Sequence, residues 1–301
     1  MYVITGATGH TGKLIAEALL AAGKPVTAIS RTAAHLTDLS AAGAHTAEGS
    51  LEDADFLTRT FEGATAVYAM IPPNFATEDF TAYQYRVADA LYTAIVAAKV
   101  RHVVFLSSVG AHLEAGSGVL LGLRYFEDKL AALTGTHTLS LRAGFFMENF
   151  LSSAGLLRNA GILGGFPIQG DIPMPMVHTR DIAAVAARYL LALDFEGFSV
   201  QYVAGARDLT FQEAATILGT AVGRPQTPWV QFSYEDARQG MIQNGLQPNM
   251  ADLYIAFSRT ANEGRLAGDY QRTAANTTPT TLEMFSAEFA QAYAQVAGQP
   301  A

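Results

Sequence analysis

A glycine-rich turn near the start of the chain has the residue types and spacing needed to hold a dinucleotide. Residues 5–12 read Thr-Gly-Ala-Thr-Gly-His-Thr-Gly and lie between an apolar run and a helical pattern. In that context Gly6 permits a tight turn, Gly9 lets the backbone approach a pyrophosphate, and Gly12 lets the helix pack closely on the strand. The spacing is G-x-x-G-x-x-G rather than the commoner G-x-G-x-x-G, and a turn that only connects two elements is the alternative. We predict that the cofactor's phosphates bind at Gly6, Ala7, Thr8, Gly9, His10, Thr11 and Gly12.

Arg31 stands where dinucleotide-binding folds choose between the two nicotinamide coenzymes. It follows the second apolar run, 19 residues after Gly12, and no carboxylate is present there. An Asp or Glu at this place binds a ribose 2′-hydroxyl, whereas a guanidinium matches a 2′-phosphate in charge and geometry. The sequence therefore favours NADP(H) over NAD(H), with a solvated surface Arg31 as the alternative.

Tyr125 and Lys129 form a Y-x-x-x-K spacing, which places both side chains on one face of a helix. In conventional short-chain reductases such a lysine holds the nicotinamide ribose and lowers the pKa of the tyrosine. The tyrosine then donates a proton to the carbonyl that receives hydride. Ser107 or Ser108 would orient the substrate oxygen. The alternative is a chance spacing on the flank of a buried helical stripe, where a tyrosine simply packs its ring.

The elements that must position these residues alternate along the first half of the chain. Short apolar runs predict strands at residues 2–5, 26–30, 44–47, 66–71, 102–107 and 137–142. Helical patterns predict helices between them, at about 81–99 and 123–133 among others. This alternation is typical of βαβ units, so we expect an α/β fold with a doubly wound parallel Rossmann sheet.

Beyond Arg142 the chain becomes rich in glycine and proline, which indicates a loop-rich substrate side. A helical pattern from Asp181 and a strand pattern at 199–203 indicate a return to the sheet. We therefore predict an NADP-binding Rossmann domain at 1–150 with 178–204 added. The remainder, 151–177 and 205–301, forms a smaller, discontinuous C-terminal substrate lobe.

Composition restricts the possible partners. The chain has 301 residues, half of them hydrophobic, a formal charge of -8 and no cysteine. It lacks the basic surplus of a nucleic-acid binder, and its histidines show no metal-binding spacing, so we expect neither nucleic acid nor metal. The first strand begins at Tyr2 and no apolar run reaches membrane length, so we expect a soluble, cytoplasmic protein without membrane contact.

Several segments together resemble the NmrA-like family of atypical short-chain dehydrogenases/reductases. They are the glycine turn, Arg31, the stretches 106–110 and 141–150, Thr179-Arg180-Asp181-Ile182-Ala183, and the closing segment 279–283. The family includes NADPH-dependent quinone and dye reductases, reductases of phenylpropanoid compounds, and catalytically silent regulators that sense NADPH. The resemblance therefore implies the fold more narrowly than the reaction.

The resemblance also implies positions for further cofactor contacts. It implies that Ser50 lies near adenine, that Ile71, Pro72 and Ser107 line the cofactor channel, and that Gly144 and Phe145 approach the nicotinamide. Lys129 inherits a cofactor-holding role, whereas the family generally lacks the tyrosine at 125. Two departures are Ser50, where an Asp is usual, and Ala143, where a Pro is usual.

Aromatic residues after the sixth predicted strand suit a flat acceptor. Phe145, Phe146 and Asn149 follow the carboxyl end of that strand, where open α/β sheets bind ligands. Phe146 and Asn149 are the predicted substrate contacts, with burial in the core as the alternative for the phenylalanines. We expect Asp181 to cap the helix that starts at Ile182, and His178 at most to line the site.

Two functions remain open at this stage. One is an NADPH-dependent reductase that passes hydride to a small quinone-like or aromatic acceptor. The other is a non-catalytic NADPH sensor that changes its contact with a protein partner. Arg31 argues against a third, a nucleotide-sugar epimerase that retains NAD.

Overall fold

Seven strands form one sheet in the order β10-β6-β5-β4-β1-β2-β3, which places β1 between β2 and β4. The computed structural model describes residues 1–296. The pairs β1–β2, β1–β4, β2–β3 and β4–β5 are parallel. The strands are β1 (Tyr2–Ile4), β2 (Val26–Ser30), β3 (His45–Glu48), β4 (Ala66–Ala69), β5 (His102–Ser108), β6 (His137–Ala143) and β10 (Phe198–Val203). The predicted Rossmann sheet is confirmed, and its strand order reverses beside β1, where such sheets bind ligands.

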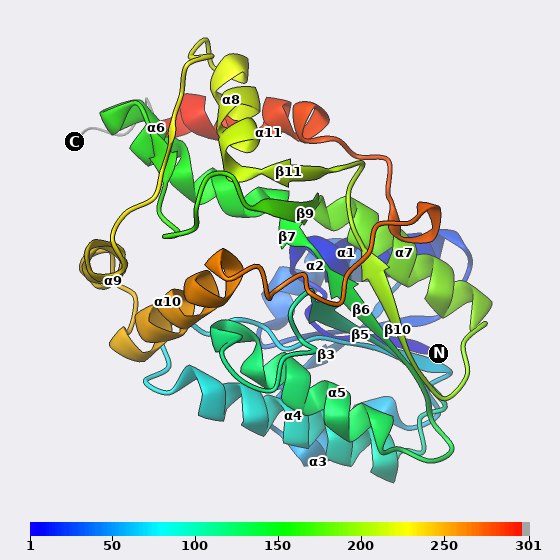
Figure 1. The fold of residues 1–301 in the computed structure, drawn as a ribbon. Helices are drawn as coiled ribbons and strands as arrows, with labels where there is room; N and C mark the ends of the chain where they lie inside the picture. Colours follow the sequence, from blue (N-terminus) through cyan, green and yellow to red (C-terminus); the bar gives the residue numbers. More distant parts are fainter. Residues whose placement is uncertain (297–301) are drawn as a thin grey trace. The chain divides into compact units, whose positions relative to one another are not determined.

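Helices cover both faces of this sheet. In Figure 1, α3, α4 and α5 lie along one face, and α1 and α7 along the other. Asp53 and Asp79 cap α3 and α4 by accepting from the amides of Phe56 and Ala82. The helices are α1 (His10–Ala21), α2 (Thr37–Ala41), α3 (Ala54–Phe61), α4 (Phe80–Ala97), α5 (Leu121–Ala131) and α7 (Thr179–Ala192), with 3-10 turns η1 (Ala33–Leu36) and η2 (Gly118–Leu120).

The chain divides into two compact units. The first comprises 1–111, 120–142 and 182–201, and the second comprises 112–119, 143–181 and 202–301. We predicted that the first domain would run to residue 150 and that 178–204 would return to it. The segment 143–150 instead belongs to the second unit, because Phe145 and Phe146 pair with β9.

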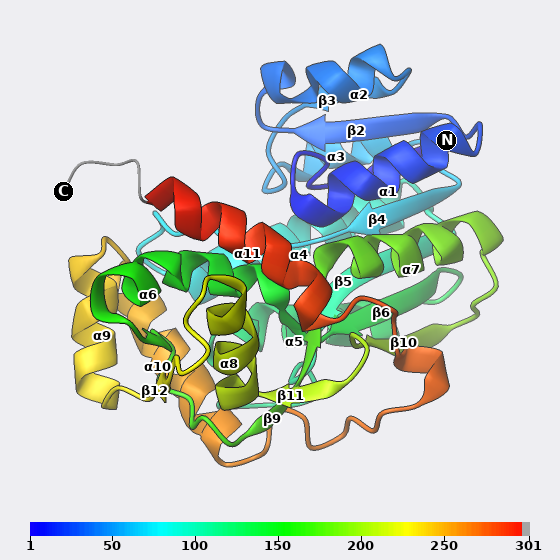
Figure 2. The same ribbon diagram turned by 90° about the horizontal axis from the view of Figure 1, so that it is seen from above.

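The second unit has two small sheets, in the orders β11-β9-β7 and β12-β8. Their strands are β7 (Phe145–Phe146), β8 (Leu163–Gly164), β9 (Pro173–Val177), β11 (Asp208–Thr210) and β12 (Trp229–Val230). Its helices, seen from a second direction in Figure 2, are η3 (Met147–Ser153), α6 (Ala154–Ala160), α8 (Phe211–Ala221), α9 (Tyr234–Gln243), α10 (Pro248–Asn262), η4 (Ala274–Asn276) and α11 (Leu282–Val296). Thr210 and Glu213 form the capping box of α8, as the sequence indicates. Within residues 1–296, no helix combines the length and apolar character that a membrane span requires.

Candidate functional site

The glycine turn joins β1 to α1 in a conformation that two of its glycines make possible. Gly6 has φ +60, in the left-handed region that side chains disfavour. A Cβ on Gly12 would lie 2.3 Å from the carbonyl oxygen of Gly6. The start of the helix therefore packs directly on the turn, which requires glycine at both positions.

The first amides of α1 are available to an anion. Thr8 and His10 are exposed, and no side chain caps the helix at Gly9, whose own amide donates to the Gly6 carbonyl oxygen at 2.9 Å. The first N–H groups of any helix lack intrahelical partners, and the helix dipole adds partial positive charge there. This geometry suits a phosphate, as predicted for residues 6–12.

A cleft of about 370 Å³ adjoins the turn, within the roughly 300–1,000 Å³ common for small-molecule sites. All of its lining residues belong to the first unit. They include five residues that the sequence singled out: Gly6, Thr8, Arg31, Ser50 and Pro72. The turn, the end of β2 and the loops after β3 and β4 thus meet at one cleft.

Arg31 brings an uncompensated positive charge to this cleft. Its side chain is exposed and forms no ion pair or hydrogen bond within residues 1–296. Glu52 also lines the cleft, but its carboxylate is paired with Arg86, at 2.8 Å between Oε2 and Nε. The charge of Glu52 is therefore balanced by Arg86, whereas that of Arg31 has no partner within residues 1–296.

Two predicted channel residues do not line this cleft. Ile71 is buried, and Ser107, 2% exposed, donates its hydroxyl hydrogen to Glu127 Oε1 at 2.6 Å. Glu127 also accepts from Arg142, at 2.6 Å from Nη2 and 3.1 Å from Nε. The hydroxyl of Ser107 is thus engaged in a buried network that joins β5, α5 and β6.

Tyr125 and Lys129 lie on α5 and share one partner on α4. The Tyr125 hydroxyl donates to Asp89 Oδ1 at 2.8 Å, and Lys129 Nζ lies 2.9 Å from the same oxygen. Lys129 lowers the pKa of Tyr125, as expected, but partial burial and the hydrogen bond to Asp89 outweigh this effect, so the pKa of Tyr125 is raised. The hydrogen bond to Asp89 also raises the pKa of Lys129. Both polar groups are therefore held by a helix-to-helix contact.

Phe145 is the centre of an aromatic cluster in the second unit. Its ring lies 5.4 Å from Phe150, 5.9 Å from Phe166 and 5.3 Å from Phe211, in each case edge to face. Phe150 and Phe211 are buried, whereas Phe145 and Phe166 remain partly exposed. The cluster thus has a buried base and an accessible side.

Three further residues, predicted near the nicotinamide or the acceptor, lie close to Phe145 in the sequence. Gly144 allows close packing, since a Cβ there would lie 2.2 Å from the Pro175 carbonyl oxygen. Phe146 is partly exposed, and Asn149 is exposed on η3. These positions leave Phe146 and Asn149 accessible from solvent.

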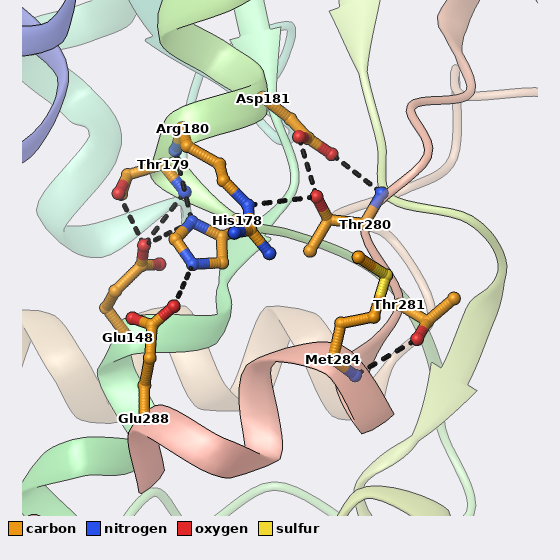
Figure 3. A network of polar contacts seen from close by, with 9 residues as sticks. All are labelled: Glu148, His178, Thr179, Arg180, Asp181, Thr280, Thr281, Met284 and Glu288. Atoms are coloured by element: carbon orange, nitrogen blue, oxygen red, sulfur yellow. Dashed lines mark hydrogen bonds and ion pairs between the residues drawn. The ribbon is translucent and has the colours of Figure 1, made fainter.

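His178 lies between two carboxylates in the second unit (Figure 3). Its Nδ1 is 3.0 Å from Glu148 Oε1, and its Nε2 is 2.9 Å from Glu288 Oε1. Burial alone would lower the pKa of His178, but the hydrogen bonds to both carboxylates outweigh it and the pKa is raised. Burial would likewise raise the pKa of Glu148, yet hydrogen bonds from His178 and Thr179 lower it. His178 therefore ties η3 to α11.

Asp181 does not cap the helix that follows it, contrary to our expectation. Helix α7 begins at Thr179, and the Asp181 carboxylate accepts from the amide and hydroxyl of Thr280, at 3.0 and 2.7 Å (Figure 3). Thr280 is close in space but 99 residues away in sequence. A local capping pattern could not reveal this partner.

Sequence reasoning missed several residues that line the cleft. Thr32 and His35 follow Arg31 directly, so the polar run after β2 was an available signal. Asn74 follows Pro72 on the same loop. Tyr83 reaches the cleft from α4, and its position depends on how that helix packs on the sheet.

Comparison with known proteins shows which family this chain resembles over most of its length. The profile of the NmrA-like family matches residues 2–285. The chain is 30% identical to the NAD(P)H azoreductase of Xenophilus azovorans, over 99% of both chains. It superposes with a TM-score of 0.82 on an NADPH-dependent quinone oxidoreductase of Escherichia coli complexed with NADPH. That pair is 25% identical and covers 96% of this chain and 99% of the other.

A regulatory protein shares the same fold. The structure of NmrA, a negative transcriptional regulator in complex with NADP, matches with a TM-score of 0.69 and 16% identity. It covers 100% of this chain and 92% of the regulator. At this identity the likeness concerns the fold alone.

Proposed function

Because the chain belongs to the NmrA-like family, we propose that it is an NADPH-dependent reductase whose acceptor is a small quinone-like or aromatic molecule. The azoreductase and the quinone oxidoreductase, which resemble it over nearly their full lengths, support this reaction class. The observation that carries the proposal is the unpaired Arg31 guanidinium in the cleft beside the glycine turn. Those two features together suit a dinucleotide with an extra phosphate.

The residues of the first unit have distinct tasks in this proposal. The amides of Thr8 and His10 hold the pyrophosphate, and Arg31 pairs with the 2′-phosphate. Ser50 and Pro72 line the adenine and ribose side of the cleft. When bound, NADPH supplies the hydride, and these residues supply its affinity and orientation.

The residues of the second unit would select the acceptor. The accessible rings of Phe145 and Phe166 offer flat apolar surfaces, and Phe146 and Asn149 flank them. Aromatic rings stack favourably on such surfaces. A quinone accepts hydride readily and can take its proton from water, so the reaction requires no protein acid.

The catalytic role of Lys129 and Tyr125 remains a prediction, and the geometry favours a structural pair. Asp89 engages both side chains, and no residue of α5 lines the cleft within the described chain. We therefore assign the hydride-transfer reaction no proton donor from α5.

The reductase proposal is tested by following NADPH absorbance with 1,4-naphthoquinone and with an azo dye as acceptors. We expect acceptor-dependent oxidation of NADPH, with much slower oxidation of NADH. Tight binding of NADPH without oxidation by any acceptor would contradict the reductase and support the sensor instead. Absence of binding to either coenzyme would remove both functions.

A further inference from the structure

Tyr254 on α10 is a largely enclosed tyrosine whose hydroxyl has no protein partner. Its hydroxyl forms no hydrogen bond within residues 1–296, and the hydroxyl oxygen is not one of the unpartnered side-chain atoms that are sealed from solvent. Tyrosine hydroxyls in such places usually find a partner. Other tyrosines of the same unit do so, since Tyr234 accepts from Asn262 Nδ2 at 2.9 Å and Tyr270 bonds to Asp208. Tyr254 thus has hydrogen-bonding capacity that the folded protein leaves unused.

The ring of Tyr254 extends the aromatic cluster. It lies 5.7 Å from the ring of Phe166, which in turn lies 5.9 Å from Phe145. All three side chains belong to the second unit and are partly exposed. They form an aromatic wall with one polar group, the hydroxyl of Tyr254, at its end.

Several contacts hold α10 against this wall. Asn262 donates to the Pro167 carbonyl oxygen at 2.9 Å and accepts from the Gln169 amide at 2.8 Å, which ties the helix to the loop that carries Phe166. At Gly118 a Cβ would lie 2.0 Å from the Leu253 carbonyl oxygen. The position of Tyr254 is therefore fixed by its surroundings rather than by a ligand.

Burial raises the pKa of Tyr254, so its hydroxyl keeps its proton at neutral pH. A protonated phenol can donate one hydrogen bond and accept others. Facing an aromatic acceptor that bears a carbonyl oxygen, it would act as a donor. Planar molecules that lack an oxygen or nitrogen atom able to accept a hydrogen bond could pack against the rings but could not bond to the hydroxyl.

We propose that the Tyr254 hydroxyl donates a hydrogen bond to a carbonyl oxygen of an aromatic acceptor that packs against Phe166 and Phe145, whose ring planes meet at 89°. This inference rests on the proposed reductase function and refines its acceptor class to carbonyl-bearing aromatics. Tyr254 then acts as a specificity-determining residue that touches the acceptor. No proton is transferred from it, and the reduced acceptor takes its proton from water.

The test compares two ligands of the same shape, 1-tetralone, which has one carbonyl group, and tetralin, which has none. Both are titrated into the NADP⁺-loaded protein by ligand-observed NMR, so that no hydride transfer occurs. We expect Tyr254→Phe to weaken the binding of 1-tetralone by about two- to tenfold and to leave that of tetralin unchanged, because it removes one neutral hydrogen bond and keeps the ring. Tyr254→Leu, which also removes the ring, should weaken both.

Tyr293→Phe is the matched control, because Tyr293 lies on α11 of the same unit and contacts Arg158 through its ring. It should leave both ligands unaffected. Equal affinity of 1-tetralone for wild type and Tyr254→Phe would overturn the inference, and so would a parallel loss of both ligands in Tyr254→Phe. A purely structural role cannot separate the two ligands.

The same titration distinguishes this inference from the proposed function. One outcome is that the wild type oxidises no NADPH with any quinone, while Tyr254→Phe still binds 1-tetralone more weakly than the wild type does and binds tetralin equally well. In that case the reductase proposal fails and the aromatic site stands. If quinone reduction proceeds and Tyr254→Phe changes neither KM nor 1-tetralone affinity, the reductase stands and this inference fails. When both hold, Tyr254→Phe raises KM for 1,4-naphthoquinone with little change in kcat.

Discussion

The cleft beside the glycine turn and the aromatic wall of the second unit are built in opposite ways. The cleft uses residues from Gly6 to Val87, and its anion-binding groups are backbone amides and one guanidinium. The wall joins side chains from Phe145 to Tyr254, and its chemistry lies in rings and one hydroxyl. A site made of backbone amides depends mainly on the conformation of the chain. A site made of aromatic side chains changes its shape and chemistry whenever one of those residues is replaced. We infer that the first unit fixes the coenzyme while the second is free to vary the acceptor.

The largest expected effect on the coenzyme cleft comes from adding a side chain at Gly12. Gly12→Val should reduce NADPH affinity by up to about 150-fold, because its Cβ would collide with the backbone of Gly6 and overpacking costs about 1–3 kcal/mol. Calorimetric titration with NADPH measures the loss. Gly155→Ala is the control, since nothing lies within 4 Å of a Cβ there. Unchanged affinity in Gly12→Val would show that the turn does not hold the cofactor.

The next largest effect concerns the choice between coenzymes. Arg31→Ser should weaken NADPH by about 10- to 100-fold, because it removes charge-assisted hydrogen bonds to the 2′-phosphate. NADH, which lacks that phosphate, should change by no more than about twofold. Titration with each coenzyme decides the point, with Arg59→Ser on α3 as the control. Equal weakening of both coenzymes would show that Arg31 does not contact the 2′-phosphate.

A smaller effect, on the free energy of unfolding, is expected in the second unit and depends on pH. His178→Asn should lower the free energy of unfolding by about 1–3 kcal/mol near pH 6, because it removes the bridge between Glu148 and Glu288. The raised pKa of His178 stabilises the fold below its ordinary value of 6.5, and this contribution is lost as pH rises through the raised pKa. The lowered pKa of Glu148 contributes above 4.5 and is lost as pH falls through the lowered value.

The difference between wild type and His178→Asn should therefore be largest between about pH 4.5 and 6.5 and shrink in alkali. Denaturant unfolding across this pH range provides the measurement. The exposed His45, when changed to Asn, should show no such pattern. A difference that stays constant from pH 5.5 to 9 would mean that His178 carries no charge in the folded protein.

The smallest expected effect concerns α5. Tyr125→Phe and Lys129→Met should each change kcat/KM less than about threefold and the free energy of unfolding by about 1 kcal/mol or less, as partly exposed ion pairs do. Steady-state kinetics with 1,4-naphthoquinone measures the first quantity. A tenfold loss of kcat/KM with intact stability would restore the catalytic role that the Y-x-x-x-K spacing indicates.

Much of the first unit could be predicted because its signals are local. The predicted strands match β1 to β6 closely, since alternation of apolar runs and helical patterns reflects burial within each element. The glycine turn was identified because the backbone conformation itself requires those glycines. The hydrogen bond of Ser107 to Glu127 could not be predicted, because Glu127 lies on a helix whose packing the sequence does not reveal.

In the second unit, contacts between residues close in sequence could be predicted, whereas contacts between distant residues could not. The capping box at Thr210 was predicted because both partners lie within three residues. Asp181 was misassigned because Thr280, a distant residue, competes for the same carboxylate. The pair Phe145–Phe146 left core and site equally open, and only the pairing of β7 with β9 placed it in the second unit.

By itself the sequence determined the alternating α/β pattern, the turn at Gly6 to Gly12 and a cation after β2, because each depends on neighbours within a few residues. Only the tertiary structure decided that Arg31 has no protein partner, that Asp89 engages Tyr125 and Lys129, and that Tyr254 lies beside Phe166. The physical reason is that charge pairing and ring contact depend on distances between side chains, which chain connectivity fixes only after the helices and sheets have packed.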